Sequence, residues 1–237
     1  MSIRRGTIYQ VPEFKTASGL LVLTNDEWNE AQTKEIAGTP VFSGVGPGRE
    51  PIPGTSLFAG TVLTVEKEWL ATAVRQLDAS QLKPVEDMLT DVLALDLLRT
   101  SPPQGPTGQP GLIDYPRWSE IYYAGPPLGD PPEPKRQVAV SSDGYNHALK
   151  GAIFVRTTTS SRRGGEAFPA LADGTKAVCM LPTFIPSTNV RLGARERRPV
   201  PRQFFLPDMA AIASGLGFAL DVRRLDWRDA RRDTEVR

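Results

Sequence analysis

The chain has 237 residues, 40% hydrophobic and 23% charged, which is ordinary globular usage and excludes a disordered chain or a coiled coil. The net charge of +1 hides an asymmetry. Residues 1–99 carry nine Lys and Arg against 13 Asp and Glu, net −4, whereas residues 100–237 carry 19 against 14, net +5. If either half faces phosphates, the later half is therefore the one expected to do so.

Cysteine and histidine usage limits the chemistry. Cys179 and His147 are the single residues of their types, which excludes an internal disulfide and a multi-cysteine zinc site. We expect no metal and no cofactor. No apolar run approaches the roughly 18 residues needed to span a bilayer, and no signal-peptide stretch follows the N-terminus, so a cytoplasmic protein without a membrane partner is expected.

A Pro- and Gly-rich segment, residues 101–111, divides the chain. It cannot hold a helix or a central strand and indicates an extended linker. The sequence thus predicts a first domain over residues 1–99, a linker over 100–115, a second domain over 116–225 and a charged tail over 226–237.

The two predicted domains repeat each other. Residues 6–9 match residues 119–122, which lie 113 positions later, and both are strand-forming. Residues 22–31 match residues 139–148, 117 positions later, and both read as an apolar strand followed by Asp-x-aromatic-Asn-x-Ala. A third pairing matches Glu86-Asp87-Met88 with Pro207-Asp208-Met209, 121 positions later.

Each half is predicted to contain a first strand, a variable loop, a second strand ending in the Asn-containing turn, further β structure and one C-terminal helix. This is a small α+β barrel-like unit. Helical spacing of apolar residues predicts the first helix over residues 84–98 and the second over residues 207–221. Gly215 and Gly217 in the second helix indicate close packing against another backbone.

Residues 5–9, residues 21–26 with Asn29, and the helix with Asp87 resemble the MazF/PemK/CcdB group of bacterial toxins. The second half resembles the same domain again, through residues 120–122, 135–141, 145–146, 153–159 and 206–209. The resemblance implies a tandem pair of small SH3-like β-barrel domains, each with a C-terminal helix, forming a pseudo-dimer within one chain.

The resemblance also implies an activity: the toxin of a toxin–antitoxin system, a metal-independent endoribonuclease that cleaves single-stranded RNA by 2′-hydroxyl attack and is held by an antitoxin protein. In the family, an arginine beginning the second strand steadies the phosphate, and a threonine or serine ending the third strand binds the scissile group. The arginine position falls on Arg136, or on Lys135 if the register shifts by one, and the hydroxyl position on Thr158, between Thr157 and Thr159.

Two arginines and two glycines follow these hydroxyls. Arg162 and Arg163 with flexible glycines would suit an RNA phosphate, and a plain polar turn is the alternative. The first half departs from the family pattern, because residues 17–19 hold no cation unless Lys15 reaches in, and its hydroxyl position is best matched by Ser43. We therefore interpret the first half as a degenerate copy and the second as the candidate active copy.

Other chemistry-bearing residues have simpler explanations. His147 is attractive as a general base, but it matches Glu30 in the repeat and is interpreted as a surface residue. Cys179 lies in an apolar run and is interpreted as core. A second hypothesis stays open: the fold has lost catalysis and is a binding module for an antitoxin-like protein or a gyrase-type target.

Overall fold

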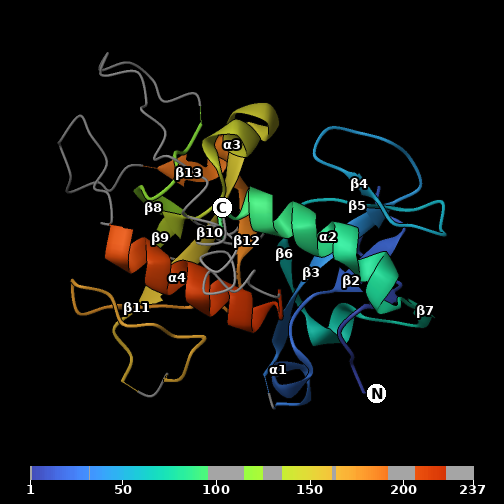
Figure 1. Cartoon of the computed structure of the whole chain (residues 1–237), viewed down its shortest axis with the longest axis horizontal. Coiled ribbons are helices and arrows are strands. Elements are labelled where there is room, and N and C mark those ends of the chain that lie inside the picture. The colour runs from blue at the N-terminus through green and yellow to red at the C-terminus, as the bar shows by residue number, and fades with distance from the viewer. Residues whose placement is uncertain are drawn as a thin grey trace, which may run out of the picture.

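The computed structural model describes residues 2–31, 33–95, 115–124, 135–161, 164–191 and 206–222. Two curled antiparallel sheets, of seven and six strands, form the two halves of the molecule, and the long helices α2 and α4 lie on the same side of both sheets (Figure 1). Apart from Tyr115, the predicted linker lies outside the described residues, as does the whole predicted tail.

In the first half the strands lie in the order β4-β5-β3-β2-β1-β7, with β6 also paired to β3. The elements are β1 (Thr7–Tyr9), β2 (Gly19–Val22), α1 (Asp26–Glu30), β3 (Glu35–Phe42), β4 (Glu50–Pro51), β5 (Phe58–Ala59), β6 (Leu63–Glu66), the 3-10 helix η1 (Lys67–Trp69), β7 (Ala73–Gln76) and α2 (Ala79–Val92).

In the second half the order is β11-β10-β9-β8-β13, with β12 also paired to β10. The elements are β8 (Ile121–Ala124), β9 (Lys135–Ala139), α3 (Asp143–Leu149), β10 (Gly151–Thr158), β11 (Lys176–Ala177), β12 (Thr183–Pro186), the 3-10 helix η2 (Ser187–Asn189), β13 (Val190–Arg191) and α4 (Leu206–Ala219).

The order of elements predicted from the sequence is present in both halves. Strand pairing supports the offsets of the first two matches, because Ile8 pairs with Leu21 and Ile121 pairs with Val138. The segment read as an Asn-containing turn is a short helix in both halves, α1 and α3.

The predicted start of the first long helix is wrong. Helix α2 begins at Ala79, five residues before Pro84, and ends at Val92. Asp78 caps it: its Oδ1 accepts from the backbone N–H of Gln81 at 3.0 Å, and the Gln81 side chain accepts from the N–H of Asp78 at 3.2 Å. This reciprocal cap outweighs the signal of Pro84, which lies inside the helix.

The third match, of residues 86–88 with residues 207–209, has the wrong register, because α2 begins earlier than expected. The buried residues of α2 correspond to those of α4 at an offset of 127 rather than 121, as Leu82, Val85 and Leu89 do to Met209, Ile212 and Leu216. Ala94 and Asp221, also 127 apart, both have φ of 49° where the chain leaves the helix. The second helix itself, predicted over residues 207–221, is confirmed within two residues.

One hydrophobic core serves both halves. A single buried cluster contains Ile8 and Leu21 of the first sheet together with Val138 and Ile153 of the second. Helix α4 approaches its neighbours closely, since a Cβ on Gly215 would lie 2.7 Å from Cys179 Sγ and 3.0 Å from a backbone oxygen. The close packing predicted at Gly215 is therefore confirmed, and the halves bury apolar surface against each other.

The repeated Asp-x-aromatic-Asn motif holds each half together. Asp26 Oδ1 accepts from the backbone N–H of Arg5 at 2.6 Å, and Asp143 Oδ1 accepts from that of Trp118 at 2.7 Å. Both asparagines are buried, and each accepts from the hydroxyl five residues before it and donates to the backbone carbonyl of that same residue. In the first half, Thr24 Oγ1 donates to Asn29 Oδ1 at 2.6 Å and Asn29 Nδ2 donates to Thr24 O at 2.8 Å. In the second half, Ser141 Oγ donates to Asn146 Oδ1 and Asn146 Nδ2 donates to Ser141 O at 3.0 Å.

The aromatic residue of the motif reaches into the other half in both copies. The ring centroids of Trp28 and Phe168 lie 6.1 Å apart, and the Tyr145 hydroxyl donates to Thr61 Oγ1 at 2.6 Å. Burial raises the pKa of Tyr145 to about 12, so this hydroxyl keeps its proton across the physiological range. The motif therefore joins the halves as well as folding each of them.

Backbone hydrogen bonds also join the halves, and they do so reciprocally. The N–H of Asn25, at the start of α1, donates to the carbonyl of Ala219 at the end of α4, at 3.1 Å. The N–H of Ser142, at the start of α3, donates to the carbonyl of Val92 at the end of α2, at 2.8 Å. Carbonyls at the end of each long helix, which have no partner within the helix, are thus satisfied by the opposite half.

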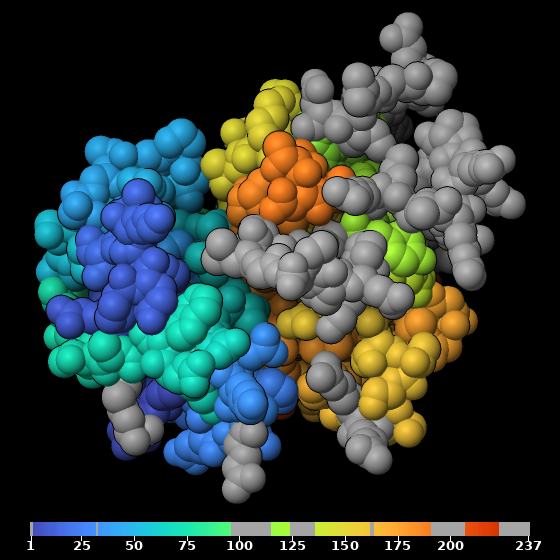
Figure 2. Space-filling model, turned by 180° about the vertical axis from the view of Figure 1, so that it is seen from behind, coloured from blue at the N-terminus to red at the C-terminus, as the bar shows by residue number. Residues whose placement is uncertain are grey.

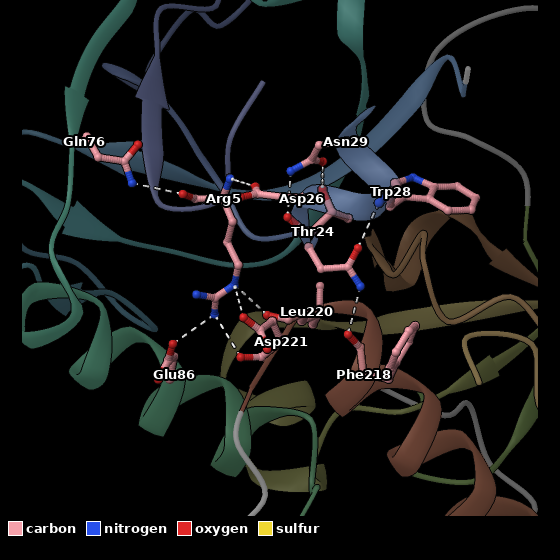
Figure 3. Close-up of polar contacts among 11 residues, drawn as sticks. Arg5, Thr24, Asp26, Trp28, Asn29, Gln76, Glu86, Phe218, Leu220 and Asp221 are labelled. Atoms are coloured by element: carbon pink, nitrogen blue, oxygen red, sulfur yellow. Dashed lines mark hydrogen bonds and ion pairs between the residues drawn. The ribbon is translucent and has the colours of Figure 1, made fainter. Parts of the chain in front are cut away.

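Arg5 reinforces one of these two helix ends (Figure 3). Its guanidinium donates to the carbonyl of Leu220 at 3.0 Å and that of Asp221 at 3.2 Å, and forms an ion pair with Glu86 of α2 at 2.9 Å. A cation at a helix C-terminus is favourable because carbonyl dipoles converge there. The matching position of the second half is Trp118, which lines a small space between Ala94, after α2, and helix α4.

Candidate functional site

The two faces of the second sheet decide which predicted site residues meet. We name them by their buried residues: the Val138 face belongs to the main core, and the Phe154 face belongs to a separate cluster. Because side chains alternate along a strand, Arg136 and Thr157 lie on the Val138 face, whereas Thr158 lies on the Phe154 face. The structure therefore does not bring Arg136 and Thr158 together on one face.

Arg136 is held by a carboxylate. Its guanidinium forms an ion pair with Asp173 at 2.6 Å, and Asp173 also accepts from the backbone N–H and the hydroxyl of Thr175 at 3.0 and 2.6 Å. Partial burial alone would raise the pKa of Asp173, but the hydrogen bonds of Thr175 and Arg136 outweigh it and lower that pKa. Arg136 thus ties strand β9 to the segment before β11.

The predicted hydroxyls lie at the end of β10. Thr158 is half-buried, accepts from the N–H of Ser160 at 3.2 Å, and stands opposite Lys176 of β11. Thr157 donates to the carbonyl of Arg136 at 3.4 Å, and Thr159 is exposed just beyond the strand. A backbone contact thus occupies Thr157, whereas Thr158 is the hydroxyl with cations on its own face.

Of the remaining predicted RNA-binding residues, the structure describes the backbone position of Lys135. Lys135 is the first residue of β9, where it pairs with Ala124 of β8. Arg162 and Arg163 lie outside the described residues.

Sequence reasoning missed two cations beside Thr158. Arg156 lies two residues before Thr158 on the same face, and Lys176 pairs directly with Thr158 across β10 and β11. The signal was present in the sequence, because alternation in a strand ending Arg156-Thr157-Thr158 puts the first and third residues on one side.

The first half is apolar at the same three positions. Strand pairing matches β3 with β10 at an offset of 116, so the counterparts of Arg156 and Thr158 are Pro40 and Phe42. The counterpart of Lys176 is Phe58, which pairs with Phe42. Arg49 lies over the Phe42 ring, 3.6 Å from its centroid.

The hydroxyl match proposed for the first half is wrong by one residue. Ser43 is exposed and follows the end of β3, so it corresponds to Thr159, while Phe42 occupies the position of Thr158. The counterpart of Arg136 is Gly19, where a Cβ would lie 2.4 Å from the carbonyl oxygen of Tyr9. No side chain fits there without a backbone shift, and Lys15 is exposed in the preceding loop.

His147 and Cys179 lie where the sequence analysis expects them. His147 is exposed on α3, with its ring 5.1 Å from that of Tyr115. Cys179 is fully buried, and burial raises the pKa of its thiol, so it is not a nucleophile at neutral pH.

A buried carboxyl group distinguishes the second half. Glu120 is 5% exposed and accepts from the hydroxyl of Tyr122 and, at 3.3 Å, from the N–H of Arg117. Burial raises the pKa of Glu120, and burial together with the charge of Glu120 raises that of Tyr122. The counterpart of Glu120 in the first half is Thr7, which donates to the Gln76 side chain.

Metal and membrane features were searched over the described ranges. No three His, Cys, Asp or Glu side chains in these ranges group closely enough to hold a metal ion. No helix among the described residues is long and apolar enough to cross a membrane.

Among known proteins, the chain is similar to solved structures. No protein-family model and no curated protein matches the chain. A solved endoribonuclease in complex with its cognate antitoxin from a mycobacterial species is similar at a TM-score of 0.37 and 17% identity, over 46% of this chain and 97% of that one. A TM-score at this level carries no inference about function.

Proposed function

We propose that the chain is a toxin of the MazF/PemK/CcdB kind in which two copies of the domain are fused. The second half is a metal-independent endoribonuclease for single-stranded RNA, and the first half is a degenerate copy that completes the pseudo-dimer. An antitoxin protein is the proposed partner, since an enzyme that cleaves the cell's own RNA must be restrained.

The exchange of contacts between the halves supports the fused pair. Asn25 and Ser142 occupy matching positions, and so do their acceptors Ala219 and Val92 on the opposite long helices. When a residue of one half contacts the other half, and its counterpart makes the same contact in the opposite direction, the interface is of the isologous, two-fold kind. This reciprocity supports the proposal that the two halves associate as the subunits of a homodimer would.

The observation that carries the proposal is the difference at three matching positions. The second half presents Arg156, Thr158 and Lys176, where the first half presents Pro40, Phe42 and Phe58. Two cations and a hydroxyl on one half-buried face suit a phosphodiester, and the apolar set does not.

The chemistry needs little more from the protein. Attack of a 2′-hydroxyl on the adjacent phosphorus forms the P–O2′ bond, gives the 2′-hydroxyl proton to solvent and puts extra negative charge on the phosphoryl oxygens. The P–O5′ bond then breaks, and the leaving 5′-oxygen takes a proton from solvent. Fixed cations and hydroxyl donors stabilise that charge. We assign Thr158 to the phosphoryl oxygens. The cations named by the family pattern are Lys135 and Arg136, and of these Arg136 would have to act from the opposite face of the sheet.

The proposal is tested with purified full-length protein and a mixed-sequence single-stranded RNA in the absence of added metal. Cleavage should leave a 2′,3′-cyclic phosphate and a 5′-hydroxyl, and Thr158→Ala should slow it by about 100-fold because it removes one donor to the transition state. Thr188→Ala, an exposed threonine in η2 of the same half, is the matched control and should cleave like the wild type.

One observation favours the alternative, a non-catalytic binding module for an antitoxin-like protein or a gyrase-type target. Arg136, the cation that the family pattern places in catalysis, is paired with Asp173 on the face opposite Thr158. Absence of any cleavage by folded, antitoxin-free protein would favour the binding module and make partner capture the next experiment.

A further inference from the structure

Two cations share a face with Thr158: Lys176 lies directly opposite it on β11, and Arg156, the arginine of the pair, lies two residues earlier on β10. Residues i and i+2 of a strand lie on one face about 6.6 Å apart, a distance that a phosphate group spans when one oxygen meets the hydroxyl and another meets the guanidinium. Arg136 is on the other face and paired with Asp173. A phosphate bound at Thr158 therefore meets Arg156 before Arg136.

Arg156 is positioned by the first half of the chain. Its Nη2 lies 3.6 Å from Oε1 of Glu35 at the start of β3, and the two side chains are 30% and 41% exposed. The counterparts of Arg156 and Glu35 are Pro40 and Gly151, so this ion pair has no equivalent on the other side of the pseudo-dimer. It is one of the places where the symmetry between the halves is broken.

The seam between the halves holds the ion pair in place. The N–H of Phe184 in β12 donates to the carbonyl of Val62 at 2.8 Å, and Thr64 Oγ1 in β6 donates to the carbonyl of Pro182 at 3.0 Å. Strands β6 and β12 pair with β3 and β10, which carry the two charges. Figure 2 shows the two halves packed side by side, seen from behind.

The ion pair leaves the guanidinium able to bind a phosphate. At 3.6 Å the contact between Arg156 and Glu35 is longer than a hydrogen bond, so it orients the guanidinium but leaves its N–H groups available to a phosphate. An arginine fork can donate two parallel hydrogen bonds to phosphate oxygens, which a lysine cannot.

We infer that Arg156 is the arginine that binds the RNA phosphate at Thr158, and that Glu35 of the first half positions it across the seam. This inference rests on the proposed ribonuclease function. It gives the first half a part in the site: the degenerate copy supplies the carboxylate that orients the arginine of the active one.

The test separates binding from cleavage. Full-length protein is titrated with a fluorescent 2′-O-methyl RNA oligonucleotide, which has no 2′-hydroxyl to attack, at several salt concentrations, and cleavage of ordinary RNA is measured in parallel. Arg156→Ala should weaken binding about tenfold and reduce the salt slope by about 0.7, the value for one lost phosphate contact on a single strand. Arg156→Lys should restore the salt slope but not the cleavage rate, because it keeps the charge and loses the fork.

Glu35 is tested through Arg156. Glu35→Gln should lower kcat with little change in KM and an unchanged unfolding midpoint, and it should have no further effect in an Arg156→Ala background. Arg75→Ala, in the edge strand β7 of the first half, is the control and should match the wild type.

The outcomes distinguish the inference from the function on which it rests. A wild-type protein that neither binds nor cleaves RNA contradicts the proposed function. A wild type that does both, with Arg156→Ala and Arg156→Lys as active as Arg75→Ala, overturns the role of Arg156. Additive losses for Glu35→Gln and Arg156→Ala overturn the role of Glu35.

Discussion

The two halves of this chain share their framework and differ at the positions where chemistry can occur. Hydrogen bonds of the Asp-x-aromatic-Asn motif recur at both copies with nearly the same distances. At the ends of β10 and β3, by contrast, Thr158 of the second half occupies the position that Phe42 occupies in the first. The comparison teaches that the contacts that build and join the halves are common to both, whereas the surface at the ends of β3 and β10 is apolar in one half and polar in the other.

The largest effect is expected at the matching positions Trp118 and Arg5, because the second half packs an indole beside helix α4 and the first half places an arginine at the end of that helix. Trp118→Ala should lower the free energy of unfolding by about 4 kcal/mol, since it empties a space that the nearly buried indole fills beside helix α4. Arg5→Ala at the matching position should cost about 2 kcal/mol, because it removes charge-assisted bonds to the α4 terminus. Urea unfolding measures both.

A larger loss for Arg5→Ala than for Trp118→Ala would contradict the comparison, because helix capping rather than apolar packing would then contribute more to the stability of the contact between the halves. Arg4→Ala, an exposed neighbour of Arg5, serves as the control for the removal of an arginine from this segment and should stay within about 0.5 kcal/mol of the wild type.

The next effect concerns the two buried asparagines. Asn146→Ala should lower the free energy of unfolding by about 3 kcal/mol and Asn29→Ala by about 2 kcal/mol, since each leaves buried polar groups without a partner. Asn146 donates in addition to the carbonyl of Pro116 at 2.8 Å, which accounts for the greater loss. Thermal or urea unfolding distinguishes the two, and equal losses would show that the Pro116 contact adds nothing to stability.

The smallest effect is a dependence on pH that arises from the buried Glu120 carboxyl of the second half, for which the first half has Thr7 instead. Burial raises the pKa of Glu120, so its protonated form is favoured in the folded state; the associated stability is full below about pH 4.5 and is lost as the pH rises through the raised pKa. Glu120→Gln should flatten this decline of the unfolding midpoint. Burial raises the pKa of Asp143 too, so part of the decline should remain.

Glu27→Gln, an exposed residue of α1, is the control for this measurement and should keep the wild-type profile. A decline that is equally steep in Glu120→Gln and in the wild type would show that the Glu120 carboxyl does not titrate in this window.

Sequence reasoning was most accurate where local patterns decide structure. The Asp-x-aromatic-Asn segment was visible because its Asn and the hydroxyl that precedes it by five residues bond to each other within a short stretch of chain. The start of α2 was missed because two local signals competed: Pro84 is common at the first turn of a helix, but the cap from Asp78 and Gln81 stands earlier in the chain.

The candidate site was only partly accessible from the sequence. Thr158 was found through the family pattern, whereas its neighbours depend on strand register, and a shift by one residue moves a side chain to the opposite face. The pairing of Gln137 with Arg156 fixes that register and separates Arg136 from Thr158. Glu35 had no signal of its own, because it approaches Arg156 from the other half of the chain.

The sequence by itself determined the order of elements in each half and the burial of Cys179, because these follow from periodicity, capping and composition within short windows. Only the tertiary structure decided which cation shares a face with Thr158 and that Glu35 meets Arg156 across the seam. The physical reason is that pairing register and the docking of two sheets are set by the total burial of apolar surface, a sum over residues far apart in the chain.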